Sequence, residues 1–470
     1  MDAVRIALAC ALPWVAGAGL LASLATVDRA QPVGAAAWRV GCGWFVGIFV
    51  ATLVLRVQSR LGVPFGLGSS GVALAMLAVL ALVVPLRARR VHARGVWQAL
   101  AGRDLTGWRR IAWWALLAWV AIRFGMLLAE VVWRPMYPWD AWAQWATKAR
   151  VWFGVGAMAP FVSEPEWLQA TTAGVYFDHA PRYPATVPLM QTWIAIALGR
   201  WDDALVNVPW WVSGVAFGIA VFGFLREQGF DPLAALVATW LALSLPVLDA
   251  HIALAGYADL PMATFFTLGA LAALRAVRSR SRVDAAVAVV LLVACVTIKN
   301  PGRVWVATLV PAILVARWPD RARRIAALTL GVALLLVLVL ARLEPVILGY
   351  RLQLSFALPW SSLADAYLFF GNWHLLWYAV VAVALLGVRH LLGRELAPMT
   401  MVVGAGAMFL LLGFTLTNAG IWVEDQSTVN RATLHLAPLC VIWMVLVFRE
   451  WSARTAPGAF AVTTAPAHAD

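Results

Sequence analysis

The sequence predicts an all-α polytopic membrane protein, and three observations support this fold class. Hydrophobic residues make up 63% of the 470 residues and charged residues only 13%. With a mean hydropathy of +0.82, this composition excludes a water-soluble globule. Apolar runs of helix-spanning length recur along the whole chain. Spanning β-strands are excluded, because the runs are too long and do not alternate between apolar and polar residues.

The apolar runs predict about 13 transmembrane helices. A spanning helix needs about 20 apolar residues, with about 17 as the lower end, so the shorter runs must extend into flanking residues or tilt little. The runs comprise residues 5–26, 37–55, 71–86, 111–133, 205–225, 232–248, 260–274, 285–298, 304–315, 325–340, 373–388, 398–416 and 434–448.

Basic residues in the short connectors predict the orientation of the chain. Arginines concentrate in residues 87–110, 275–282, 317–324 and 389–394, and short basic loops mark the cytoplasmic side of a membrane protein. Counting crossings from these loops places the N-terminus outside. The same count places five polar connectors outside: residues 134–188, 257–261, 299–302, 343–372 and 418–431.

One apolar segment, residues 183–199, does not fit this count as a crossing. It is short and carries Pro184 and Pro188, and a crossing here would reverse the side of everything that follows. We therefore interpret it as re-entrant or interfacial. Such a segment is tolerated at membrane depth where it lines a cavity or is covered by protein.

The predicted organisation has four parts. Residues 1–110 form N-terminal transmembrane helices, and residues 111–342 form a core that contains the large outer loop 134–188. Residues 343–454 form C-terminal transmembrane helices with outer loops. Residues 455–470 are rich in Ala, Pro and Thr and are expected to be a disordered tail.

The net charge and the cysteines exclude two classes of function. The charge of +13 is spread over short connectors, whereas nucleic acid binding needs a basic folded domain. The four cysteines, Cys10, Cys42, Cys295 and Cys440, lie inside apolar runs without metal-ligand spacing. We therefore expect them to be small core residues.

The outer loop 134–188 is the longest polar interruption in the chain. Asp140, Gln144 and Lys148 recur at i, i+4 and i+8, so they share one face if the segment is helical. Aromatic residues such as Trp145 and Trp152 fall on the opposite arc. The pattern predicts an interfacial helix over residues 139–153 that holds a charged site above the membrane. The alternative interpretation is a solvated amphipathic linker.

Several ionisable residues map to the predicted outer side. Ionisable groups at helix ends that face a cavity are costly to place there, so a functional role is the default hypothesis. The first loop provides Asp140, Lys148, Arg150, Asp178, His179 and Arg182, and later loops provide His251, Asp259, Lys299, Glu424, Asp425, Arg431 and His435.

Four short motifs resemble the polytopic glycosyltransferases of the GT-C fold, which include protein O-mannosyltransferases and lipid A aminoarabinose transferases. The motifs are PWDAWAQWATKA at residues 138–149, DHAPRYPATVP at 178–188, YADLP at 257–261 and TIKNPG at 297–302. The likeness covers about residues 112–315. The chain departs from the family where Ala141 follows Asp140, in place of a second acid, and in its extra helices before residue 111.

The resemblance implies a glycosyltransferase of the bacterial cytoplasmic (inner) membrane. It would transfer a sugar from a polyprenyl-phosphate donor to a lipid, glycan or protein acceptor on the outer face. A carboxylate can take the proton of the acceptor hydroxyl, and Asp140 is the candidate base. Lys148, Arg182 and Lys299 are the candidates to bind the donor phosphate. The supporting residues are Asp178, His179, Tyr183, Asp259 and Arg431.

Alternatives remain open for several of these residues. Arg182 could pair with Asp178, and His179 could ligate a divalent metal such as zinc or manganese with Asp178 or Asp140. Asp259 could orient a cation or cap a helix.

The function has alternatives as well. They are a transporter or flippase for a lipid-linked saccharide, a polysaccharide ligase or polymerase, and a non-catalytic membrane scaffold.

Overall fold

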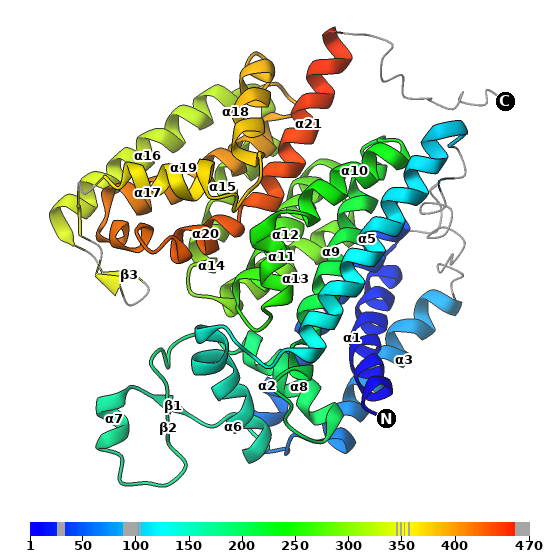
Figure 1. The fold of residues 1–470 in the computed structure, drawn as a ribbon, viewed down its shortest axis with the longest axis vertical. Helices are drawn as coiled ribbons and strands as arrows, with labels where there is room; N and C mark the ends of the chain where they lie inside the picture. The colour runs from blue at the N-terminus through cyan, green and yellow to red at the C-terminus, as the bar shows by residue number, and fades with distance from the viewer. Residues whose placement is uncertain are drawn as a thin grey trace.

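The computed structural model describes residues 1–25, 33–87, 102 and 105–455, except 345, 348, 349, 352, 356 and 357. The predicted tail beyond residue 455 and most of the first basic connector, 87–110, lie outside the described residues. The described chain folds into a bundle of long helices, and the outer loop projects from one end of it (Figure 1).

Eight helices among the described residues are long and apolar enough to cross a membrane, which confirms a polytopic all-α protein. They are α1 (Asp2–Leu24), α2 (Ala35–Arg60), α3 with its preceding turn (Leu67–Arg87), α5 (Gly107–Trp133), α9 with its preceding turn (Leu205–Glu227), α12 (Asp259–Ser279), α16 (Ala322–Leu343) and α19 (Ala397–Leu416).

Two further apolar runs are each divided into two helices. α10 (Pro232–Leu243) and α11 (Pro246–Ala253) meet at 68°, and α20 (Ser427–Leu434) and α21 (Ala437–Thr455) meet at 52°. Pro246 is the first residue of α11 and Pro438 the second residue of α21, and a proline has no backbone N–H with which to continue the hydrogen bonds of the preceding helix. The number of spans in the described chain reaches 10 if each pair is one span.

Three predicted runs form helices shorter than a typical span. The run at 285–298 forms α13 (Arg282–Ile298), which has 17 residues, and the run at 373–388 forms α18 (Leu376–Gly387), which has 12. The run at 304–315 is divided between α14 (Gly302–Ala307) and α15 (Leu309–Arg317). Apolar composition alone does not reveal where a helix starts and stops.

The remaining elements are short and lie mostly in the loops. They are the π-helical turns η1 (Leu67–Gly71), η2 (Ala141–Ala146) and η5 (Asp365–Phe369), the 3₁₀ turns η3 (Leu205–Asn207), η4 (Pro319–Arg321) and η6 (Asn418–Val423), the helices α6 (Thr147–Val155), α7 (Glu164–Leu168), α8 (Thr186–Leu198) and α17 (Trp360–Ala364), and the strands β1 (Phe161–Val162), β2 (Tyr176–Phe177), β3 (Val346–Ile347) and β4 (Tyr350–Arg351). β1 pairs with β2 in parallel and β3 with β4 antiparallel.

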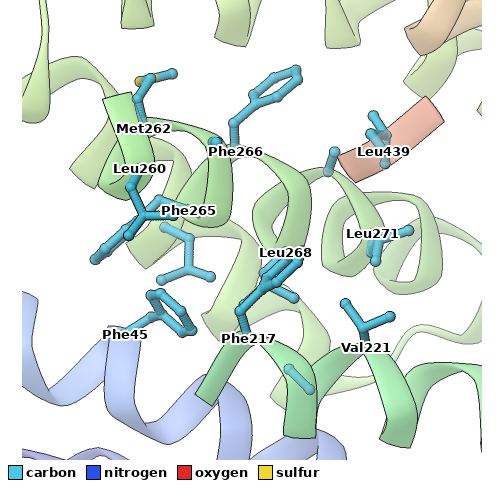
Figure 2. Packing of buried hydrophobic residues seen from close by; sticks show 14 of the residues in the cluster. Phe45, Phe217, Val221, Leu260, Met262, Phe265, Phe266, Leu268, Leu271 and Leu439 are labelled. Atoms are coloured by element: carbon cyan, nitrogen blue, oxygen red, sulfur yellow. The ribbon is translucent and has the colours of Figure 1, made fainter. Parts of the chain in front are cut away.

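Helix α12 lies at the centre of the bundle. Its Phe265 ring meets Phe45 of α2 edge-on at 5.1 Å, and Figure 2 shows side chains of α9 and α21, among them Phe217 and Leu439, around the same core. The spanning stretch of α12 is 83% buried, whereas that of α16 is 11% buried. α16 therefore lies at the periphery, and its leucines are suited to contact lipid.

Helices α1 and α2 pack unusually closely because glycines line their contact. A Cβ added to Gly47 would lie 1.7 Å from the carbonyl oxygen of Pro13, so no larger residue fits at this position. Small residues of this kind let helix backbones approach each other inside a membrane.

Helix α8, which forms most of the segment 183–199, begins and ends at the same end of the bundle. At its start, Thr186 hydrogen-bonds with Arg56 near the end of α2, and at its end Leu198 accepts a hydrogen bond from Arg5 near the start of α1. The start of α1 and the end of α2 share one end, because these helices form an antiparallel pair (Figure 1). Every residue of α8 is buried, so protein covers this segment.

Candidate functional site

A cluster of charged residues from four separate segments lies at the end of the bundle that carries the outer loop. Nη2 of Arg431 donates to Oδ2 of Asp140 at 2.5 Å, and Nε of Arg431 donates to Oδ2 of Asp259 at 2.9 Å. Nζ of Lys299 donates to Oδ1 of Asp259 at 2.6 Å. Nε2 of His435 lies 3.0 Å from the same Oδ1, and it donates there because an ionised carboxylate only accepts. We call these five residues the charge cluster.

Local structure explains how each side chain reaches the cluster. Asp140 precedes the π-helical turn η2, and Asp259 is the first residue of α12. Lys299 directly follows α13, where the amide of Gly302 closes a turn onto its carbonyl oxygen at 2.9 Å. A Cβ at Gly302 would lie 2.0 Å from the carbonyl oxygen of Cys295, so the tight return of the chain after Lys299 requires glycine.

Asp259 is the buried centre of the cluster. Its side chain has 0% exposure, and Lys299, Arg431 and His435 donate to its two oxygens. A buried carboxylate is tolerated only when it is paired and hydrogen-bonded, and this one has three donors. Of the two alternatives for Asp259, the structure supports the orientation of cations, because its side chain makes these contacts and no capping bond.

Arg431 links the buried carboxylate to the exposed one. Its guanidinium lies 4.3 Å from the centre of the Tyr257 ring, a distance typical of a cation–π contact. The ring and the two carboxylates together fix the plane of the guanidinium. Within the described residues, Nη1 of Arg431 makes no hydrogen bond, so a donor direction remains for a ligand.

The members of the cluster differ in their access to solvent. The side chain of Asp140 is 33% exposed, that of Arg431 16% and that of Lys299 14%, whereas Asp259 has none. A dissolved or lipid-linked molecule can therefore reach one carboxylate and the edges of two cations. A small hollow lies near the start of the outer loop, and Tyr137, Pro138 and Asn207 contribute to its lining, whereas no residue of the charge cluster does.

Lys148 makes its contacts outside the charge cluster, contrary to the expectation that it binds phosphate beside Asp140. Its Nζ lies 2.6 Å from Oδ2 of Asp178, and both side chains are almost fully buried. It also donates to the carbonyl oxygen of Ala180 at 3.0 Å. Burial lowers the pKa of Lys148, and the carboxylate of Asp178 opposes this shift.

A π-helical turn explains why Lys148 does not point to the same side as Asp140, as the sequence had predicted. The segment is helical, as expected, but residues 141–146 form the π-helical η2 before α6 begins. A π-helix has more residues per turn than the 3.6 assumed for i, i+4 and i+8 spacing. The direction of Lys148 relative to Asp140 therefore changes across η2. The aromatic arc is divided too: Trp145 and Trp152 are buried, whereas Trp142 is exposed.

Among the described residues, Arg182 and His179 also lie apart from the contacts of the charge cluster. Arg182 is exposed and makes no ion pair within the described chain. The alternative that it pairs with Asp178 is wrong, because Lys148 pairs with that carboxylate. His179 is exposed and its ring packs on Phe177 at 4.7 Å. Tyr183 packs edge-on against Trp145 at 5.4 Å.

Metal binding finds no support in the part of the chain that the structure describes. No group of three or more His, Cys, Asp or Glu side chains there could hold a metal ion. Asp178, one of the candidate metal ligands, forms an ion pair with Lys148 instead.

Sequence reasoning included His435 among the outer ionisable residues without a specific role, and it gave no role to Tyr257. A signal for His435 was present, because it follows Arg431 by four residues and such residues share a helix face. Tyr257 precedes Asp259 by two residues, but nothing in its surroundings indicated that its ring would lie under an arginine from residue 431.

No protein-family model, curated protein or solved structure matches this chain.

Proposed function

We propose that this protein is a membrane glycosyltransferase that moves a sugar from a polyprenyl-phosphate donor to a hydroxyl of a lipid, glycan or protein acceptor. The observation that carries the proposal is the position of Arg431, which joins the exposed Asp140 to the buried Asp259 at one end of an apolar bundle. An acid, a phosphate-binding arginine and a lysine are thus available at a place that a lipid-linked substrate can reach from the membrane.

Asp140 is the proposed general base. It accepts the proton of the acceptor hydroxyl while the hydroxyl oxygen forms a bond to the anomeric carbon of the sugar. The bond between that carbon and the phosphate oxygen breaks, and the phosphate leaves as an anion without needing a proton. Of the two carboxylates in the cluster, Asp140 is the exposed one, and a base must come within hydrogen-bond reach of its proton.

Arg431 and Lys299 are the proposed partners of the donor phosphate. Both side chains are partly exposed, and Nη1 of Arg431 makes no hydrogen bond to another described residue. Charge-assisted hydrogen bonds to phosphate are strong and strengthen further as the leaving phosphate gains charge. This assignment replaces Lys148 and Arg182 with Arg431 and keeps Lys299 from the sequence-based proposal.

The membrane arrangement that we propose follows the GT-C resemblance. The short helices α13 and α18 and the divided pair α14–α15 cross the membrane together with the longer spans, which gives about 13 crossings. The charge cluster faces the outer side of a bacterial cytoplasmic membrane. The basic connectors support this orientation, since short basic loops remain on the cytoplasmic side.

Substitution of Asp140 tests the proposed function. The assay measures transfer from a synthetic short-chain polyprenyl-phosphate sugar by the purified protein. Asp140→Asn keeps size but removes basicity, so turnover should fall about 10²- to 10⁴-fold. Glu424→Gln is the matched control, because Glu424 is an exposed acid of the last outer loop outside the cluster, and it should retain normal turnover.

The outcome also separates the alternatives. Near-normal turnover by Asp140→Asn would contradict base catalysis by this residue. Movement of the lipid-linked sugar across a proteoliposome membrane without any transfer would favour a flippase, and products of many sugar units would favour a polymerase.

A further inference from the structure

A second charged surface lies at the end of the bundle opposite Asp140. It consists of the turns between α12 and α13, between α15 and α16, and between α18 and α19. The first and third turns touch directly, because Nη2 of Arg278 donates to the carbonyl oxygens of Arg394 and Glu395 at 2.9 and 2.8 Å. α14 and α15 lead away from Lys299, so the second turn also lies away from the charge cluster (Figure 1).

Arginines without partners dominate these three turns. The exposed residues that define this arginine surface are Arg280 in the first turn, Arg282 at the start of α13, Arg323 and Arg324 at the start of α16, and Arg389 and Arg394 in the third turn. Within the described residues, none of their side chains makes an ion pair or a hydrogen bond. The neighbouring acid Glu395 already lies 3.5 Å from Arg278.

The arginine surface borders the apolar exterior of the bundle. Arg323 and Arg324 lie in the first turn of α16, whose leucines are exposed, with Leu328 69% exposed and Leu335 58% exposed. A ligand at these arginines therefore meets hydrocarbon-facing side chains within two helical turns. This combination of exposed guanidinium groups above an apolar face fits a molecule with an anionic head and an apolar tail.

We propose that the arginine surface binds the headgroups of anionic phospholipids. Arginine forks match phosphate oxygens geometrically, and each basic residue near an anionic lipid surface strengthens binding by about fivefold, which corresponds to about 1 kcal/mol. The proposal does not depend on the glycosyltransferase activity, because it concerns residues at the opposite end of the chain's long helices.

Native mass spectrometry of the purified protein with added phosphatidylglycerol tests this site. The triple variant Arg282→Gln, Arg323→Gln, Arg394→Gln removes one arginine from each turn. Its apparent Kd for phosphatidylglycerol should rise at least about fivefold. The corresponding lysine variant keeps the charge and should bind phosphatidylglycerol nearly as well as the wild type, which separates loss of charge from loss of folding.

A matched control removes the same charge from the other end. Arg60, Arg150 and Arg303 are exposed and make no ion pair within the described chain, so their triple glutamine variant should bind phosphatidylglycerol normally. Equal weakening in both triple variants would overturn the proposal, because net charge alone would then explain binding. Equal affinity for phosphatidylcholine, or displacement by inorganic phosphate at similar concentrations, would also overturn it.

Discussion

Replacing Lys148 with Met should destabilise the outer loop by about 3–5 kcal/mol, the usual cost of removing one partner from a buried ion pair. The magnitude needs no discount for solvent, because both Lys148 and Asp178 have side-chain exposures of 2% or less. Methionine nearly fills the volume of lysine, so the change mainly removes the charge and the hydrogen bond to Ala180. The carboxylate of Asp178 is then buried without its cation.

Hydrogen exchange of the segment around β2 measures this effect. The amide of Asp178 donates to the carbonyl oxygen of Val162, so its exchange reports opening of the loop. A loss of 3–5 kcal/mol corresponds to an increase in the opening constant of about 10²- to 4 × 10³-fold. Arg150→Met is the control, because Arg150 is an exposed cation on the same helix α6.

A double variant makes the test specific to the ion pair. Lys148→Met with Asp178→Leu removes both charges, and replacing a buried pair with apolar residues is often close to neutral. The double variant should therefore open less readily than Lys148→Met alone. If Lys148→Met exchanges like the wild type, or if the double variant is the more open of the two, the pair does not hold the loop and the reasoning fails.

Two further predictions concern the cluster and the orientation of the chain. Arg431→Ala should raise KM for the polyprenyl-phosphate donor by about 10- to 150-fold. This is the effect of losing a hydrogen bond to a charged group, which is worth about 1.5–3 kcal/mol. An unchanged KM would exclude Arg431 from donor binding. Cysteines introduced at two exposed positions, Thr172→Cys and Ser279→Cys, should react with membrane-impermeant maleimide from opposite sides of the membrane. The native cysteines should contribute little to labelling, because all four are buried. Labelling of both introduced cysteines from the same side would contradict the orientation.

The fold class was predictable from the sequence because it depends on local composition. Runs of apolar residues identify membrane helices without knowledge of their neighbours. Helix ends depend on other features. The runs at 304–315 and 373–388 correspond to interrupted or short helices, since turns and backbone hydrogen bonds decide where a helix stops, and an average over hydropathy does not record them.

The residues of the site were predictable in part, but their pairing was not. Asp140, Asp259, Lys299 and Arg431 were selected because polar groups at helix ends in one predicted layer are costly without a role. Their partners are 40 to 291 residues apart in sequence, and no local pattern connects them. The error at Lys148 came from geometry near Asp140, where a π-helical turn changes the spacing of side chains. Arg182 was proposed from a short motif, which carries no information on where the side chain lies.

The shared arginine links the two roles proposed for the site. Without donor, Nη2 of Arg431 is held by Asp140 and Nε by Asp259, so the two carboxylates balance the charges of Arg431 and Lys299. A phosphate that binds Arg431 competes with Asp140 for the same guanidinium, whereas the buried Asp259 keeps its hold on Nε. In the proposed mechanism, the phosphate frees the carboxylate of Asp140 from Arg431, so that it can accept a hydrogen bond from the acceptor hydroxyl. Asp259 is suited to hold Arg431 during this exchange. Lys299 and His435 keep its carboxylate in place while the contact between Arg431 and Asp140 changes.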